Sequence, residues 1–509
     1  MIPTWSPETT AANTNPSDEH DHLPSEEYTH RTMPPTLGRF DMTATYICAL
    51  FLLTNAVIGA TGEPVSLIYL VLGGIIFFIP CVIITAQLGV MFPYEGALYN
   101  WTYKALGSYW SFFVGICYWL VGVLAAITAG DAFVTVLQGL NNAWLPQPWQ
   151  QGLVILAILL LAAVIGTRRF RTTQNVVNSI VCLTLVAVVL VGLAAVVWLA
   201  TGHASATNFI QPEGWSINPG NFSLFGIITL NFIGASGPLN MAGEISESGA
   251  GGRRRIIKRH LLWGTLIVFA CYFVSTLAVL VVRGQAILNA PVLPFEAFTT
   301  VNVVLGRVAG NIAVICFLGY CIAAAIFYTY ASARVLMVAG IDQRIPAHFG
   351  KLNKNRVPAY AVIFQTICAA VVVVAIFIFV PYVVPFGGNA ANTLVSIYSV
   401  NSAATTLVWT IATLFFFLNI IFLYRRHPLS FRQQRLFPMP IIWGSVAIGG
   451  IACLVTIFGV LAYSWIPPLI ANGQWWYIVG GLTLVCLVAA AIGSMVANSQ
   501  ADWETMGKV

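Results

Sequence analysis

Residues 332–358, SARVLMVAGIDQRIPAHFGKLNKNRVP, separate two hydrophobic stretches of membrane-spanning length. The segment opens with Ser332-Ala333-Arg334, passes through Asp342 and Pro346, and closes with the basic run 351–358. Basic loops stay in water while apolar helices cross the bilayer. The segment is therefore expected to connect two membrane-spanning helices.

The composition of the whole chain agrees with a membrane protein. Of its 509 residues, 58% are hydrophobic and 8% are charged, which is about a third of the charge of a soluble globular protein. A helix needs roughly 20 apolar residues to cross the hydrocarbon core. Twelve stretches meet this condition, so we expect an all-α polytopic protein with spans at 43–61, 65–88, 110–139, 150–166, 174–200, 222–245, 261–282, 308–338, 359–380, 393–424, 439–463 and 475–496.

The basic residues predict the orientation, because Lys and Arg in short loops are retained on the cytoplasmic side. With the N-terminus inside, all of the 23 Lys and Arg residues except Arg283 and Arg307 are cytoplasmic. The formal net charge of +6 is then a topology signal and gives no support to nucleic-acid binding. We expect a multi-pass protein of the cell membrane with both termini in the cytoplasm.

The two ends of the chain are expected to be cytoplasmic tails. Residues 1–40 are polar and rich in Pro, Thr, Glu and His, a composition that favours disorder and lacks the features of a signal peptide. The acidic stretch from His20 to His30 contains metal-ligand types, but its composition favours a solvated tail. Residues 497–509 form the second tail. The ten cysteines have no CxxC spacing and are expected to pack in the spans, so we expect no metal site and no cofactor.

Two groups of motifs carry a resemblance to a known family. The first is the Ser-x-Arg helix end at 332–334 with the following Asp342, Pro346 and Pro358; the second is Phe92-Pro93-Tyr94-Glu95-Gly96-Ala97-Leu98-Tyr99, followed by Leu106-Gly107 and Tyr118-Trp119. In these motifs and their order the chain resembles the amino acid–polyamine–organocation transporters. Residues 72–80 and 353–358 are similar to the glutamate/4-aminobutyrate antiporter branch.

The resemblance implies two inverted five-helix repeats followed by two further helices. The implied division is a first repeat at 41–200, an extracellular connector at 201–221, a second repeat at 222–424, and helices 11 and 12 at 425–496. It also implies that the first and sixth helices are discontinuous, which is the usual position of a substrate site in such transporters.

The sixth span contains the clearer interruption, Phe232-Ile233-Gly234-Ala235-Ser236-Gly237-Pro238. Proline deletes a backbone hydrogen bond and glycine weakens a helix, so we expect unwinding here; a plain proline kink with close helix packing is the alternative. In the first span the polar pair Thr54-Asn55 is central. The resemblance places the break at 52–54, where this chain lacks the glycine pair of most relatives. Alternatively, Thr54 and Asn55 only bond to neighbouring helices.

An amino acid substrate needs sites for a carboxylate, an ammonium group and a side chain. We expect the carboxylate at the broken first helix, where N–H groups at a helix start favour anions; the residues are Leu53, Thr54, Asn55 and Ala56. Carbonyl groups of the opened sixth helix, at Phe232, Ile233 and Ala235, are expected to accept from the ammonium group.

The resemblance also implies the walls of the substrate site. It places Val121, Gly122, Ala126 and Ala129 of the third helix against the substrate side chain, with Tyr328 and Phe232 as aromatic covers, although aromatic residues in apolar spans are more often packing residues. Ser236 stands where relatives that handle cations often carry Glu. Together with Gly234 in the break, these residues predict a small or neutral substrate.

Acidic residues within spans are costly and usually functional. Glu244 is expected to pair with an inner arginine such as Arg334 and to act as an inner gate, or else to be solvated at the interface. Asp131 faces an extracellular vestibule or is exposed at a helix end. Coupling stays open between exchange, protons and facilitated movement, since residues 178–182 lack the lysine that replaces sodium in some relatives.

We therefore expect a secondary transporter of amino acids or related small amines, with the lipid bilayer as its other partner and with a proton or counter-substrate as a further candidate. A membrane enzyme and a channel are the alternatives. The sequence shows neither a nucleophile or metal-ligand motif nor repeated filter loops.

Overall fold

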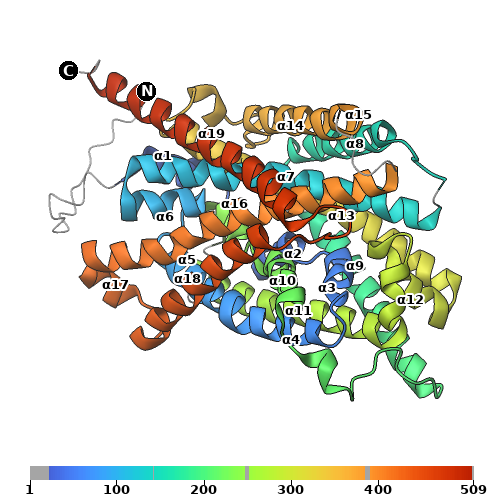
Figure 1. Cartoon of the computed structure of the whole chain (residues 1–509). Helices are drawn as coiled ribbons and strands as arrows, with labels where there is room; N and C mark the ends of the chain where they lie inside the picture. The colour runs from blue at the N-terminus through green and yellow to red at the C-terminus, as the bar shows by residue number, and fades with distance from the viewer. Residues whose placement is uncertain (1–21, 142, 247–251, 384–389, 507–509) are drawn as a thin grey trace.

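The computed structural model of the chain describes residues 22–141, 143–246, 252–383 and 390–506, and in this part of the chain the protein is built from helices (Figure 1). The long helices are α7 (Ser108–Leu140), α8 (Pro148–Gly166), α9 (Phe170–Ala200), α11 (Gly252–Val282), α13 (Arg307–Ile341), α16 (Ala390–Arg426), α18 (Met439–Ala462) and α19 (Asn472–Met506).

Two further spans contain a short π-helical turn. The first joins α4 (Val65–Gly73), η2 (Gly74–Phe78) and α5 (Ile79–Met91), and the second joins α14 (Ala359–Val373), η10 (Val374–Phe379) and α15 (Val380–Val383). The shorter helices are α1 (Pro24–Thr32), α2 (Arg39–Leu50), α3 (Leu53–Ala60), α6 (Ala97–Leu106), α10 (Ser223–Phe232), α12 (Glu296–Leu305) and α17 (Pro428–Gln434). Of the 3₁₀ segments, η5 (Gly237–Asn240) and η6 (Ala242–Glu244) matter most for the site.

Ten helices within the described residues are long and apolar enough to cross a membrane, and α2 with α3 makes an eleventh if this pair, bent by 42°, is one span. The chain is thus a polytopic membrane protein. Of the twelve expected spans, 222–245 is the exception, because α10 has only 10 residues and is followed by 3₁₀ turns. The count of twelve and the inverted repeat stay predictions.

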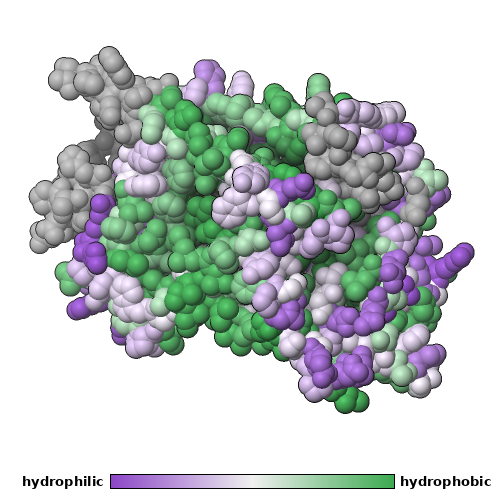
Figure 2. All heavy atoms as spheres, in the orientation of Figure 1, coloured by the Kyte–Doolittle hydropathy of each residue, from purple (hydrophilic) through white to green (hydrophobic). Residues whose placement is uncertain are grey.

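The surface has an apolar belt between two more polar ends. Figure 2 shows this belt across the middle of the molecule, while α1, α6 and α17 lie toward one end and α3 and α12 toward the other (Figure 1). Helix α7 is central, because 78% of its most apolar 18-residue stretch is buried, whereas α19 is peripheral, with 22% of the corresponding stretch buried. We call the end that carries α1 the N-terminal side.

Helices α7 and α13 pack closely at the centre. A Cβ atom on Gly122 of α7 would lie only 1.7 Å from the Ser332 hydroxyl of α13. Glycine is therefore required here for the two backbones to approach each other. This contact brings the third and eighth expected spans together, as the resemblance implies.

The segment before the first span differs from the expected disordered tail. Residues 1–21 lie outside the described residues, but 24–32 form α1, in which Ser25 and Glu26 are buried. The backbone N–H and hydroxyl of Ser25 donate to the two Asp342 oxygens at 2.9 and 3.0 Å, and Glu26 pairs with Lys104 at 2.8 Å. These tertiary contacts offset the unfavourable composition that predicted disorder.

Burial raises the pKa of Asp342 to about 7, and the hydrogen bonds from Ser25 oppose this rise because they stabilise the carboxylate. Asp342 and α1 therefore depend on each other. The polar connector at 332–358 serves, in part, as the docking site of α1.

Ser25→Ala should loosen α1, because it removes the hydroxyl that donates to the buried Asp342 carboxylate, at a cost of about 1–3 kcal/mol. Hydrogen exchange of residues 24–32 should become faster than in the wild-type protein. Thr32→Ala is the control, since the exposed Thr32 hydroxyl donates to the Tyr28 carbonyl of its own helix. Equal exchange in the two variants would contradict the docking role of Ser25.

Candidate functional site

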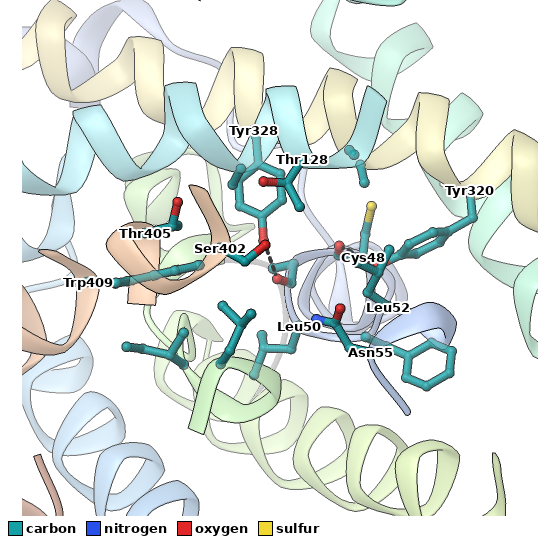
Figure 3. A pocket seen from close by; sticks show the side chains of 17 residues that line it. Cys48, Leu50, Leu52, Asn55, Thr128, Tyr320, Tyr328, Ser402, Thr405 and Trp409 are labelled. Carbon is teal, nitrogen blue, oxygen red and sulfur yellow. Dashed lines mark hydrogen bonds between the residues drawn. The ribbon is translucent and has the colours of Figure 1, made fainter. Parts of the chain in front are cut away.

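A cavity of about 60 Å³ lies at the junction of the two broken helices (Figure 3). This volume admits a few water molecules, and hence a small polar solute. None of its lining residues is charged. The lining residues are Cys48, Ala49, Leu50, Phe51, Leu52, Asn55, Ala125, Thr128, Ala129, Leu230, Ile233, Tyr320, Ala324, Tyr328, Ser402, Thr405 and Trp409.

The break in the first span lies where the sequence predicted it, to within a residue. Helix α2 ends at Leu50, Phe51 and Leu52 have extended backbones, and α3 begins at Leu53. The N–H of Phe51 still donates to the Ile47 carbonyl at 2.9 Å. The break therefore leaves the carbonyls of the last three residues of α2 without helical partners.

Three tyrosine hydroxyls supply the missing partners. Tyr320 donates to the Cys48 carbonyl at 2.9 Å, Tyr328 to Ala49 at 2.5 Å, and Tyr272 to Leu50 at 2.7 Å. The Tyr272 hydroxyl also accepts from the Leu52 N–H at 3.0 Å. The chain can thus break this helix without the glycine pair, because tyrosines on α11 and α13 satisfy its exposed backbone.

The break in the sixth span also occurs where predicted, but its second half differs from expectation. Helix α10 ends at Phe232, Ile233 is extended, and Gly234 has a φ of +107°. The chain then continues as η5 and η6 rather than as an α-helical half. The glycines of this segment and the missing N–H of Pro238 disfavour an α-helix, so the segment forms short 3₁₀ turns.

The predicted site residues separate into three groups. Asn55, Ala129, Ile233 and Tyr328 line the main cavity, and Val121, Gly122 and Gly234 line a smaller cavity beside it with Tyr118 and Trp409. The others are buried outside both linings: Leu53, Thr54, Ala56, Ala126, Ala235 and Ser236.

Phe232 does not cover the cavity, contrary to expectation. Its ring stacks on Phe78 with centroids 4.7 Å apart and on Phe269 at 6.1 Å. It therefore packs α10 against η2 and α11. Ala126 likewise contributes to a hydrophobic cluster with residues of α8 and α14, including Leu159 and Val373.

Helix α16 contributes to the cavity, which was not predicted from the sequence. Ser402, Thr405 and Trp409 lie on one face of this helix at spacings of three and four residues, and Figure 3 shows them entering the cavity from one side. The buried Nε1 of Trp409 has no hydrogen-bond partner among the described residues. The helical spacing of these polar residues in the tenth span is the sequence feature that could have indicated their place in the cavity wall.

Two hydrogen bonds join α16 to other helices near the cavity. The Tyr398 hydroxyl donates to Asn55 Oδ1 at 3.1 Å, and Asn401 Nδ2 donates to the Thr128 hydroxyl at 3.0 Å. Asp131, one turn beyond Thr128 on α7, is buried but lies outside the cavity lining. The sequence did not indicate Thr128, which lies between the predicted wall residues Ala126 and Ala129.

On the N-terminal side of the cavity, three charged residues are buried together. Arg334 donates to Glu244 Oε1 from Nε at 3.1 Å and from Nη2 at 2.5 Å, and its Nη1 donates to the Tyr330 carbonyl at 3.0 Å. Glu95 Oε2 lies 3.9 Å from Arg334 Nε. The expected pairing of Glu244 with Arg334 is therefore present, with Glu95 as a third member.

Comparison with known proteins assigns the chain to a protein family. A sequence profile of the amino acid permease family matches residues 37–497, which is most of its length. The chain belongs to the amino acid permease family.

Individual relatives of this permease are distant. It is similar to a gamma-aminobutyric acid permease of Bacillus subtilis (strain 168), with 22% identity over 334 residues, 64% of this chain and 68% of that protein. The amino-acid permease RocE of the same organism is 25% identical over 321 residues, 62% of this chain and 66% of RocE. Polyamine transporter PUT1 of Oryza sativa subsp. japonica is 42% identical over 67 residues, 13% of either chain. The permease thus covers about two thirds of the bacterial relatives and a small part of the plant protein.

Tyr272→Phe should destabilise the permease by about 1–3 kcal/mol, because it leaves the Leu50 carbonyl and the Leu52 N–H unsatisfied at the break. The measurement is the thermal unfolding temperature in detergent. Tyr69→Phe is the matched control, since that hydroxyl donates to the Asn221 side chain, away from the break. An equal shift in both variants would argue against a special role of the tyrosine contacts.

Gly234→Ala should abolish solute uptake by the permease and leave it folded, and Gly234→Leu should do so more severely. An alanine Cβ would lie 2.5 Å from Trp409 Cζ2, on a backbone with positive φ. Gly59→Ala is the control, because its Cβ meets no atom within 4 Å. Uptake into liposomes and monodispersity in detergent check both statements, and wild-type affinity in Gly234→Ala would contradict them.

Proposed function

We propose that this permease is a secondary transporter that moves amino acids or related small amines across the membrane by alternating access. The observation that carries the proposal is the uncharged cavity between the breaks of the first and sixth spans. Family membership and the names of the relatives support a solute of this class.

The chemistry of the cavity suits a zwitterion without net charge. We assign the substrate carboxylate to the amino end of α3, around Leu53, Thr54, Asn55 and Ala56, because the N–H groups at the start of a helix favour an anion. The ammonium group is assigned to the carbonyls of Phe232, Ile233 and Ala235. The Trp409 indole N–H, a buried donor at the cavity wall, supplies a further contact to an acceptor on the substrate.

The buried ion pair between Arg334 and Glu244 is the inner gate in this proposal. We assign the closure of the N-terminal side to this pair together with the backbone bonds between Leu37 and residues 244–246. Alternating access requires these contacts to break when the cavity opens to that side. Asp131 is assigned to the opposite, outer entrance.

The topology completes the proposal. It has twelve spans in two inverted repeats of five plus two further helices, with the N-terminal side in the cytoplasm of the cell and with the domain boundaries derived from the sequence. The basic residues carry the orientation.

Uptake by the purified protein in proteoliposomes tests the function. Radiolabelled amino acids should enter in a saturable manner and should be displaced by unlabelled substrate, and Gly59→Ala should behave as the wild type does. Conductance without saturation would indicate a channel. Absence of uptake for every amino acid and small amine in the panel would overturn the proposal.

The preferred substrate should be small or neutral. Ser236 occupies the break where an acid would favour cations, and the lining of the cavity carries no charge. A competition panel containing alanine, serine, 4-aminobutyrate, arginine, lysine and a polyamine is the measurement. A strong preference for the cations would show that the interpretation of the pocket is wrong.

Transport should not require sodium, and exchange against internal substrate should be faster than net uptake. The position where some relatives have a lysine is near Asn178, which instead donates to Asp41 at 2.6 Å. Without a bound ion, the empty carrier is expected to reorient more slowly than the loaded one. Initial uptake is measured with sodium or choline outside and with or without substrate inside. A steep sodium dependence would contradict this mechanism.

A further inference from the structure

Glu95 is a buried carboxylate that the substrate site does not use. It lies in the loop between α5 and α6, is 1% exposed, and neither of its carboxylate oxygens has a hydrogen-bond partner in the described part of the chain. Gly243 makes room for it, since a Cβ there would lie 3.0 Å from Glu95 Cγ and 3.1 Å from Oε1. A buried carboxylate without a donor is costly when it is ionised.

Arg334, the cation beside Glu95, already forms an ion pair with Glu244. Arg334 is fully buried and directs Nε and Nη2 at Glu244 and Nη1 at the Tyr330 carbonyl, while its guanidinium carbon lies 4.6 Å from the centre of the Phe170 ring. Its closest approach to Glu95 is 3.9 Å. Two buried carboxylates therefore share one guanidinium, and only Glu244 is hydrogen-bonded to it.

The other charged groups around Glu95 come from three elements. Arg253 of α11 donates to the Pro93 carbonyl at 3.3 Å, and Glu26 of α1 pairs with Lys104 of α6. Burial raises the pKa of Glu95 well above its usual value, and the Glu244 carboxylate raises this pKa further, whereas Arg334, Arg253 and the backbone N–H of Glu244 oppose the rise. The effect of burial on the pKa of Glu95 is therefore larger than the opposing effect of the two arginines.

Glu95 is also connected to the segment that moves in our proposed mechanism. The Gly96 N–H donates to the Asn240 carbonyl at 3.1 Å, and the Leu37 N–H donates to the Glu244 carbonyl at 2.9 Å. The segment 237–244 starts beside the smaller cavity, which Gly237 and Asn240 line, and ends at Glu244. A change at Glu95 therefore acts on the same backbone that bounds the cavity.

We propose that Glu95 is a proton-binding residue of the inner gate, which takes up a proton when the gate closes and releases it to water when the gate opens. The inference rests on the proposed transport function. The proton comes from and returns to the water on the N-terminal side, so the step is balanced without a further reactant.

The burial of Glu95 determines the sign of the pH effect. The closed gate holds Glu95 in its protonated form at pH values at which a hydrated Glu95 is ionised, so acid on the N-terminal side favours the closed gate. This preference disappears as the pH rises above the pKa of the closed state. Opening, and with it net transport, is therefore slower in acid.

The test is initial substrate efflux from proteoliposomes of uniform orientation, with the pH on the N-terminal side varied from about pH 5 to about pH 8 and the other side constant. The wild type should slow several-fold toward acid. Glu95→Gln, which is permanently neutral, should be slow at every pH and vary by less than about twofold. Glu27→Gln is the matched control, because this exposed carboxylate pairs with Arg31 of its own helix, and it should retain the wild-type profile.

A second variant keeps the test decisive if Glu95→Gln is inactive or unstable. Glu244→Gln frees Arg334 to pair with Glu95, which favours the ionised carboxylate, so the pH dependence should move toward lower pH. A wild-type profile in Glu95→Gln, or an unmoved midpoint in Glu244→Gln, would overturn the proposal. If the wild-type protein transports no solute, the proposed function fails instead, and the two failures are thus distinguishable.

Discussion

A helix broken inside a membrane must find partners for the backbone groups that the break exposes, because the bilayer offers no water to replace them. In this permease three tyrosine hydroxyls meet the requirement for Cys48, Ala49 and Leu50. Since the tyrosines belong to α11 and α13, the same bonds fix the first span against two other spans. The cavity is the space that this arrangement leaves open, and Tyr320 and Tyr328 form part of its wall.

In the sixth span, the backbone groups exposed by the break are paired by the local conformation of the chain. Gly234 adopts a positive φ against the Trp409 ring, and the chain continues as short 3₁₀ turns whose N–H groups donate to carbonyls three residues back. Such turns hold fewer bonds in register than an α-helix. The first break is therefore held by side chains of other helices, whereas the sixth is held mainly by its own backbone, which makes segment 237–244 the more adaptable half of the site.

The fold was largely predictable from sequence, and the site only in part. Apolar length located the spans, and Gly234 and Pro238 located the break in the sixth span, because these signals are local, whereas the break in the first span was placed by the family resemblance. The roles of Tyr272 and Tyr320 were not predictable, since their partners lie more than 200 residues away in the chain. The polar face of α16 is visible in the sequence as polar residues at helical spacing, and this pattern is sufficient to predict that α16 lines a polar cavity. Helix α1 was predicted to be disordered because composition does not reveal the docking site at Asp342 and Lys104.

The charged side chains of the site lie apart from the cavity, and this separation determines which residues can select the substrate. Buried charges interact strongly in a medium of low dielectric, so an acid inside the cavity would dominate substrate selection. Here the charged groups Glu95, Glu244 and Arg334 are buried together on the N-terminal side, outside the cavity lining, while the cavity wall presents hydroxyls, an amide and an indole. Selection and closure are thus assigned to different residues. The two are connected, because the backbone from Gly237 to Glu244 borders the smaller cavity at one end and carries Glu244 at the other.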